Sequence, residues 1–198
     1  FLRAIMHVSM IALVVVVLIC ALQSNARYPH ATGHGTKGQL YEALNTNESI
    51  WLYNRTYSED GHECVYAKKV SLVQDDYVFN QTYWISNQPH TQRLYGKLLM
   101  AYGDGAKLVV RENEGQGSGL EYQLLVWDST NHCGILLLET KTNGGNRNRK
   151  CELHIWNESV DKEEHLAPCR KYYEEYCTKM SPHSQTPYSS KCQMQLGR

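Results

Sequence analysis

Short stretches rich in aromatic and β-branched residues recur between residues 50 and 156, and polar or glycine-rich breaks separate them. The breaks are Asp60-Gly61, residues 74–76, residues 87–89, Gly103-Asp104-Gly105, Gly115–Gly119 and Asn143-Gly144-Gly145. Apolar runs of this length between turn residues are typical of β-strands. The pattern predicts eight strands, over residues 50–57, 64–73, 77–85, 92–102, 107–111, 120–127, 133–139 and 151–156.

The predicted strands follow one another closely, as in a meander in which each strand pairs with the next. Eight antiparallel strands suit an up-and-down barrel whose interior has room for a small ligand. A β-sandwich is the main alternative, because it also uses short antiparallel strands at regular spacing. A short helix over residues 39–44 is predicted before the first strand. The predicted fold class is therefore mainly β.

A helical pattern follows the last strand. Pro168 can occupy the first turn of a helix, where its missing N–H costs no hydrogen bond. One face of this helix then carries Cys169, Tyr173, Tyr176 and Cys177, and the other carries Arg170, Lys171, Glu174 and Glu175. The division into two faces predicts that the helix packs on the barrel wall with both thiols turned toward it.

The N-terminal segment has the pattern of a secretory signal peptide. Arg3 and His7 precede an apolar run through residue 19, and Ser24-Asn25-Ala26 supplies the small residues of a cleavage site. A membrane anchor is the alternative, but the run is too short to span a bilayer comfortably. We therefore expect a signal peptide over residues 1–26, a flexible leader over residues 27–37 and one domain over residues 38–198.

Charge and cysteine content narrow the function classes. The chain has 20 basic and 20 acidic residues, and only Arg3 of these lies in the signal segment, so no nucleic-acid or anionic-membrane partner is indicated. Cys20 leaves with the signal, and six cysteines remain for three disulfides in a secreted protein, with fifteen possible pairings. No Cys-x-x-Cys pair occurs, and His30 and His34 fall in the leader, so no metal or cofactor is expected.

Catalysis is not indicated either. The chain contains no Gly-x-Ser-x-Gly and no His-Glu-x-x-His sequence, and its glycine-rich loop lacks the strand–turn–helix setting of a phosphate loop. A Kunitz-type inhibitor is a further possibility, but such modules hold their cysteines within about 60 residues. Here the cysteines are spread from Cys64 to Cys192.

Four Asn-x-Ser/Thr sequons, at Asn47, Asn54, Asn80 and Asn157, predict a glycoprotein. They also orient the strands, because a glycan must point outward and side chains alternate along a strand. Asn80 then places Val78, Thr82 and Trp84 outside, and Tyr77, Phe79, Gln81, Tyr83 and Ile85 inside. Asn54 places Trp51, Tyr53, Arg55 and Tyr57 inside. If Cys151 pairs with Cys177 on the outer helix, Glu152, His154 and Trp156 face the cavity.

The predicted interior is therefore aromatic and contains a few ionisable groups. We expect the ligand-binding residues to be Trp51, Tyr53, Arg55, Phe79, Tyr83, Glu152, His154 and Trp156. A buried charge is costly unless it is paired. Two explanations stay open: an internal Arg55–Glu152 ion pair with no ligand role, or polar anchors for a ligand in an apolar pocket.

The arrangement resembles the hard-tick salivary lipocalins of the histamine-binding protein family. The resemblance rests on Cys64-Val65-Tyr66 opening the second strand, Cys133, Glu152-Leu153 in the last strand, Cys169 opening the helix, and Cys192. It covers nearly all of residues 38–192 and implies a lipocalin fold. It also implies the disulfides Cys64–Cys192 and Cys133–Cys169, which leaves Cys151 for Cys177.

The resemblance further implies a protein that is secreted in saliva and sequesters a small host mediator. We expect a monomer. Some members hold histamine or serotonin, others hold leukotrienes, fatty acids or sterols, and some act on host proteins. A protein-binding role is the alternative here, with aromatic side chains plugging the barrel and exposed Trp84 or Trp127 as contacts. Neither nucleic acid nor a membrane is implied as a partner.

The pattern of the amine-binding members is only partly present. Those members tend to carry an acid after the strand cysteine, where this chain has Gly134, and an aromatic residue after Glu-Leu, where it has His154. Glu152 is retained. An amine in an apolar pocket needs carboxylates and aromatic faces, and an inward Arg55 would oppose it. A lipid ligand is therefore slightly favoured over an amine.

Overall fold

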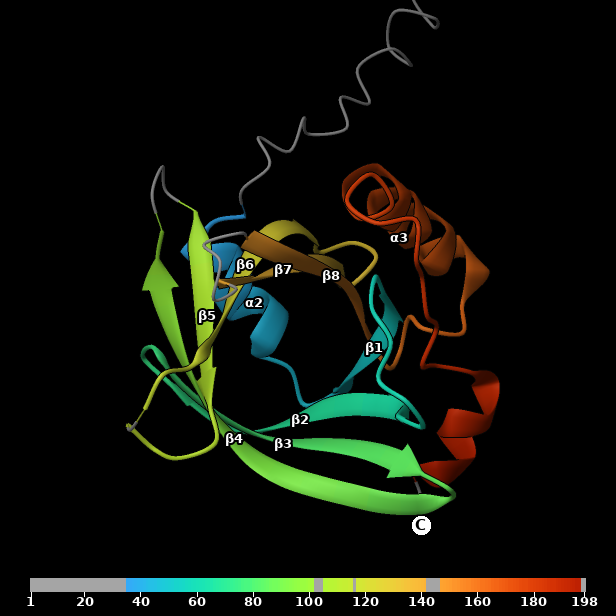
Figure 1. Cartoon of the computed structure of the whole chain (residues 1–198), viewed down its shortest axis with the longest axis horizontal. Helices are drawn as coiled ribbons and strands as arrows, with labels where there is room; N and C mark the ends of the chain where they lie inside the picture. Colours follow the sequence, from blue (N-terminus) through green and yellow to red (C-terminus); the bar gives the residue numbers. More distant parts are fainter. Residues whose placement is uncertain (1–34, 102–104, 116, 142–146, 197–198) are drawn as a thin grey trace, which may run out of the picture. The chain divides into compact units, whose positions relative to one another are not determined.

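Eight antiparallel strands close into a barrel in chain order, with each strand bonded to the next and β1 bonded to β8 (Figure 1). The computed structural model describes residues 35–101, 105–115, 117–141 and 147–196. The expected signal peptide and most of the expected leader lie outside these residues. The strands are β1 Ser49–Arg55, β2 Glu63–Val73, β3 Asp76–Ile85, β4 Gln88–Met100, β5 Ala106–Arg111, β6 Leu120–Asp128, β7 Cys133–Lys141 and β8 Arg147–Trp156. The predicted fold class is confirmed.

Two strands begin four residues earlier than predicted: β4 begins at Gln88 rather than at residue 92, and β8 begins at Arg147 rather than at residue 151. A two-residue turn at Ser86 and Asn87, both with positive φ, joins β3 directly to β4. Pro89 is therefore part of the strand and lies opposite Trp84. The prediction took this proline for a break, whereas a proline near a strand end costs little pairing.

Helix α2, Lys37–Leu44, precedes the barrel and begins two residues earlier than predicted. Thr36 and Gln39 form a capping box, which satisfies free N–H groups at the start of the helix. Leu40 and Leu44 are buried against the inner side chains of the barrel. Just before the helix, a Cβ on Gly35 would lie only 2.5 Å from Leu124, so this approach to β6 requires glycine.

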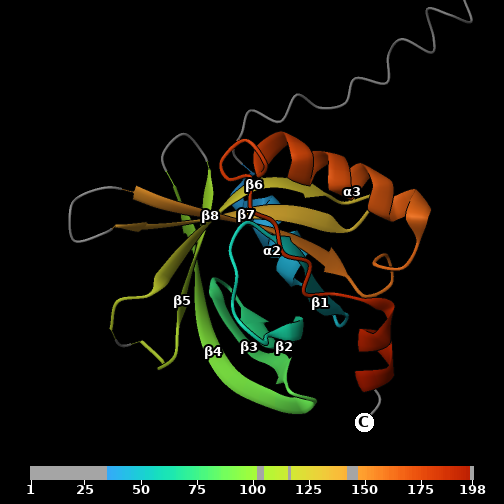
Figure 2. The ribbon, with the colours of Figure 1, turned by 45° about the vertical axis from the view of Figure 1, so that its right-hand side comes forward.

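Helix α3, Glu163–Tyr176, lies against the outside of β6, β7 and β8 (Figure 2). It begins five residues before Pro168, so the predicted start is wrong. Glu163 and Glu164 in its first turn favour the helix N-terminus, and Leu166 is buried. Pro168 lies inside the helix, where it removes one backbone hydrogen bond and its ring crowds the carbonyl group of Glu164. No helix of the described residues is long and apolar enough to cross a membrane.

Three disulfides fasten the C-terminal part of the chain to the barrel wall. Cys133–Cys169 and Cys151–Cys177 join β7 and β8 to α3. Cys64–Cys192 joins the start of β2 to a short 3₁₀ helix, η2 Ser190–Gln195. These are the pairs that the resemblance implied. The bridged cysteines are all buried, and they hold both ends of the described tail on the outside of the barrel.

Removing each bridge tests how much it contributes to stability. The Cys64–Cys192 bridge closes a separation of 128 residues and the Cys151–Cys177 bridge one of 26 residues. We expect the double alanine variants to lower the free energy of unfolding by about 5 and about 3.5 kcal/mol, because a longer loop loses more chain entropy when it is closed. Urea titration of both variants measures the two losses in the free energy of unfolding and shows which is larger. A larger loss for Cys151→Ala/Cys177→Ala would contradict it.

Candidate ligand-binding site in the barrel interior

The barrel encloses two adjoining cavities, of about 530 Å³ and about 290 Å³. The larger lies against α2, and the smaller lies toward the loop that joins β1 to β2. The two share part of their walls, formed by Ile50, Ala67, Gln81, Gln92, Leu120, Tyr122, Glu152 and His154. The shared wall contains the buried carboxylate of Glu152 together with the polar side chains of His154, Tyr122, Gln81 and Gln92, so it is the chemical centre of the site.

The wall of the larger cavity is mostly aliphatic and aromatic. Its apolar members include Leu40, Leu44, Ile50, Tyr77, Phe79, Leu94, Leu108, Val110, Leu124, Trp127, Leu136 and Trp156. They come from α2 and from strands around the barrel, because every second residue of a strand points inward. A cavity with such a wall favours the apolar part of a ligand.

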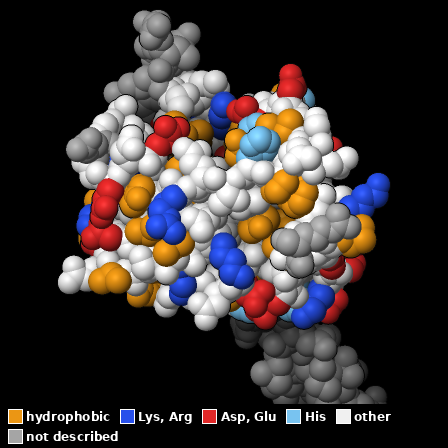
Figure 3. Space-filling model, turned by 90° about the horizontal axis from the view of Figure 1, so that it is seen from below, with side chains coloured by type: hydrophobic (Ala, Val, Ile, Leu, Met, Phe, Trp, Pro, Cys, Tyr) orange, Lys and Arg blue, Asp and Glu red, His pale blue; other side chains and the backbone are white. Residues whose placement is uncertain are grey.

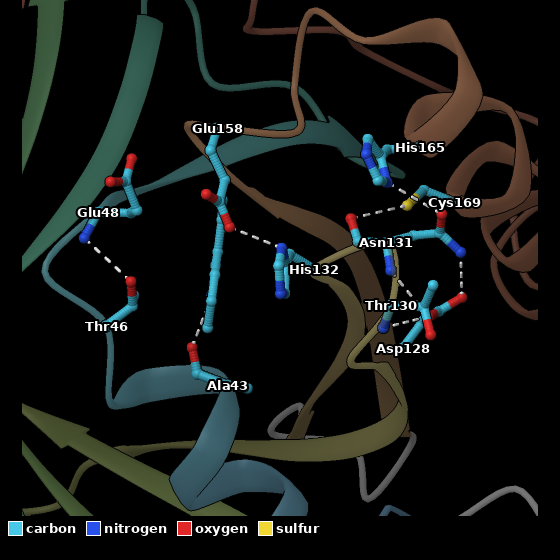
Figure 4. Close-up of polar contacts among 11 residues, drawn as sticks. Ala43, Thr46, Glu48, Asp128, Thr130, Asn131, His132, Glu158, His165 and Cys169 are labelled. Carbon is cyan, nitrogen blue, oxygen red and sulfur yellow. Dashed lines mark hydrogen bonds and ion pairs between the residues drawn. The ribbon is translucent and has the colours of Figure 1, made fainter.

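Strand β8 and helix α2 contact each other in the wall of the larger cavity. The indole Nε1 of Trp156 donates a hydrogen bond to the carbonyl oxygen of Ala43 in α2, at 3.0 Å. His132 stacks on the Trp156 ring at 4.3 Å between ring centroids, and its Nδ1 lies 2.7 Å from a carboxylate oxygen of Glu158. Figure 4 shows the His132–Glu158 pair beside Ala43. Lys37 of α2 also pairs with Asp75 at 2.7 Å. Helix α2 is therefore attached at both of its ends.

Glu152 is the central polar residue of the shared wall, and it is 4% exposed. Tyr57 Oη donates a hydrogen bond to Glu152 Oε1 at 2.5 Å, and His154 Nε2 lies 2.8 Å from Oε2. Burial raises the pKa of Glu152, but the hydrogen bonds and charge of His154, Tyr57 and Arg55 outweigh it and lower the pKa below its usual value. Glu152 is therefore an ionised carboxylate whose two oxygens each already have a partner.

Neutral tyrosines surround this carboxylate. Burial, followed by the charge of Glu152, raises the pKa of Tyr57, and the same two causes raise the pKa of Tyr122. Both phenols therefore keep their protons and act as hydrogen-bond donors at neutral pH.

Two cations line the smaller cavity and flank the Tyr57 ring. Lys150 Nζ lies 4.3 Å and Arg55 Cζ 5.1 Å from the centre of this ring. The Arg55 guanidinium donates to Gln185 Oε1 at 2.7 Å and to the carbonyl oxygen of Glu59 at 3.1 Å. Among the described residues no ion pair joins Arg55 to Glu152, although the two lie opposite each other on β1 and β8. Arg55 thus holds a loop and the tail together.

Six of the eight predicted ligand-binding residues line the cavities. Phe79 and Trp156 belong to the larger cavity, Arg55 and Tyr83 to the smaller, and Glu152 and His154 to both. Whether they contact a ligand stays a prediction. The inward orientation expected for Tyr57, Tyr77 and Gln81 also agrees with their places in the cavity walls.

Trp51 and Tyr53 do not line either cavity, so the orientation predicted for them is wrong. A β-bulge between Leu52 and Asn54 shifts the alternation, so that Leu52 and Arg55 both belong to the cavity wall. Trp51 is fully buried beneath the C-terminal segment, where its ring packs edge-on against Tyr188. Its Nε1 donates to Oδ1 of Asn157 at 2.8 Å.

Trp127 shows the opposite error. It was expected outside as a possible protein contact, but it is buried and lines the larger cavity. A second bulge, between Leu124 and Val126, again shifts the alternation. The alternation of apolar residues in β6 indicates that Tyr122 and Leu124 face inward, but nothing in the sequence marks the bulge. The contribution of α2 to the wall was also missed, because its apolar positions are few.

Two buried donors in the wall of the larger cavity have no hydrogen-bond partner in the described structure. They are the hydroxyl of Tyr77 and the indole Nε1 of Trp127. A buried donor without a partner costs free energy. An acceptor atom on a ligand would supply the missing partner. Within the described ranges, no cluster of three or more His, Cys, Asp or Glu side chains is placed to hold a metal ion.

Comparison with solved structures supports the same fold at low sequence identity. Insecticyanin from the tobacco hornworm Manduca sexta matches with a TM-score of 0.55 and 12% identity, over 76% of this chain and 82% of its own. H1 crustacyanin from the lobster Homarus americanus matches with a TM-score of 0.52 and 11% identity, over 85% and 93%. Japanin from Rhipicephalus appendiculatus, solved with bound cholesterol, matches with a TM-score of 0.51 and 14% identity, over 76% and 98%.

No curated protein sequence matches the chain. The family model described as tick histamine binding protein matches residues 31–194, which include the whole barrel, α3 and the three disulfides. The eight-stranded barrel with its internal cavities agrees with that match. The chain therefore belongs to the tick histamine-binding protein family and is a ligand-binding lipocalin.

Proposed function

We propose that this protein is secreted in saliva and sequesters a small amphipathic lipid mediator of the host inside its barrel. The observation that carries the proposal is the cavity of about 530 Å³, apolar over most of its wall and polar at the boundary with the smaller cavity. Its volume lies within the range of about 300–1,000 Å³ that small-molecule sites occupy. The proposed role is binding, without catalysis.

The distribution of polar groups favours a ligand with an apolar body and a polar end. The apolar body would fill the space between α2 and the shared wall. The polar end would meet the neutral hydroxyl donors and the cations of the smaller cavity, where Arg55 and Lys150 favour an anionic or neutral group. The hydroxyl of Tyr77 and the indole of Trp127 offer further donors along the apolar wall. Japanin, which has a similar fold, was solved bound to cholesterol, and this supports a lipid as the class of ligand to test first.

A biogenic amine such as histamine or serotonin is the second candidate. It is favoured by the ionised Glu152 and by the aromatic rings nearby, since a cation is stabilised by a carboxylate and by ring faces. The family description names histamine. The amine ranks below the lipid here, because both oxygens of Glu152 already accept hydrogen bonds from the protein.

Binding to a host protein through the loops is less well supported. The exposed apolar side chains include Val73 and Met100, which are 66% and 67% exposed. On the face in Figure 3, hydrophobic side chains are interspersed with basic and acidic ones and do not gather in one broad patch. A single broad apolar patch is what usually marks a protein-binding surface.

Blocking the larger cavity tests the lipid proposal. Val110 lines this cavity, and Lys107 lies on the same strand but pairs with Glu121 on the outer side. We expect Val110→Trp to weaken binding of cholesterol and of a long-chain unsaturated fatty acid at least tenfold, and Lys107→Trp to leave it unchanged. The quenching of intrinsic tryptophan fluorescence and calorimetry measure both. Equal losses in the two variants, or no binding of either lipid by the unaltered protein, would overturn the proposal.

Secretion is tested separately. Expression of the full chain in insect cells should release a protein whose N-terminus is Arg27, because the expected cleavage follows Ala26. Treatment with an N-glycosidase should lower its mass, and peptide mapping should find a glycan on Asn47, which is exposed just before β1. Retention of residues 1–26 in the mature protein would contradict the expected signal peptide. Asn47→Gln provides the control for glycan loss.

A further inference from the structure

We propose that His154 is a specificity-determining residue, which occupies the buried carboxylate of Glu152 and thereby excludes cationic amines from the polar end of the cavity. The inference deepens the proposed function, because it explains why the site should prefer neutral or anionic ligands. It rests on the geometry of one cluster in the shared wall. His154 acts in this account as an internal hydrogen-bond partner that occupies the place a ligand would need.

The positions of the two residues make this pairing local. Glu152 and His154 are two apart on β8, so both side chains project from the same face of the strand. His154 Nε2 lies 2.8 Å from Glu152 Oε2, while Tyr57 Oη holds Oε1 at 2.5 Å. Both residues line both cavities. A ligand that reaches the shared wall therefore meets a carboxylate whose two oxygens are already bonded.

The charges around Glu152 also disfavour an added cation. Arg55 faces it from the end of β1 and Tyr57 from the loop that follows β1, Lys150 and His154 belong to β8, and Tyr122 faces it from β6. The remaining polar residues of the shared wall, Gln81 and Gln92, are neutral. The other carboxylates of the cavity walls, Glu59 and Glu112, are exposed. Glu152 is thus the one deeply buried carboxylate among the described wall residues.

An amine gains little affinity by replacing His154 as the hydrogen-bond partner of Glu152. To reach Oε2, an ammonium or imidazolium group must displace the His154 nitrogen, so one charge-assisted hydrogen bond is lost for each one formed. The displaced imidazole would remain beside the newly bound cation, together with Arg55 and Lys150. Removing the imidazole should instead leave Glu152 with an oxygen that lacks its partner, and a buried unpaired carboxylate attracts a cation.

The test is a gain of amine binding. We expect the unaltered protein to bind histamine weakly in calorimetry at pH 7.4, and His154→Ala to bind it at least about tenfold more tightly. His154→Gln is the matched control, because its amide can still donate to Glu152 and should give a much smaller gain. Glu152→Gln/His154→Ala should lose the gained binding, since it removes the carboxylate.

Near-UV circular dichroism and the thermal midpoint of each variant report whether the barrel is folded, and His154→Leu repeats the experiment if His154→Ala does not fold. Tight histamine binding by the unaltered protein that His154→Ala weakens would overturn the inference. So would a folded His154→Ala variant without any gain in histamine binding. If His154→Ala gains histamine while no form of the protein binds lipid, the lipid proposal fails and the role of His154 stands.

Discussion

The closure of β1 against β8 is the constraint on which the rest of the structure depends. These strands lie at opposite ends of the barrel sequence, and their pairing places Arg55 opposite Glu152 and Leu52 opposite His154. Closure leaves no unpaired strand edge, and it divides the side chains into an inner and an outer set. Ionisable groups far apart in sequence are thereby brought into one water-poor space, where each must find a partner. Glu152 has two hydrogen-bond partners, Tyr57 and His154. Arg55 has partners in the tail and in the β1–β2 loop.

A barrel that contains a cavity depends on contacts on its outer surface for part of its stability. Wall side chains around a cavity lose packing contacts, which lowers stability. All three disulfides lie on the outer surface of the barrel and join its strands to α3 or η2. The aromatic ring of Trp51, packed against Tyr66 and Tyr188, adds an apolar contact between β1, β2 and the tail. The wall is therefore held by contacts that do not occupy the cavity.

Side-chain orientation could not be predicted from the sequence where the alternation along a strand is interrupted. Alternation, turn residues and the helical spacing of Cys169, Tyr173 and Cys177 were enough for the barrel and for the face of α3. They also placed Glu152, His154 and Trp156 in the cavity wall. They failed at Trp51, Tyr53 and Trp127, because a single extra residue in β1 and another in β6 reverses the face of everything beyond it. A bulge depends on the partner strand across it, so no local pattern reveals it.

Family membership and ligand chemistry are separate questions in this chain. The family match covers residues 31–194, which include the barrel, α3 and the three disulfides. The ligand is selected by a few side chains on the inner wall, where one substitution can change the charge that a ligand meets. Glu152 alone would suggest a site for a cation. His154, two positions along the same strand, alters that inference. Its imidazole lies 2.8 Å from the carboxylate and is already its hydrogen-bond partner before a ligand binds. A buried charge therefore indicates its ligand only after every partner that the protein itself provides has been counted.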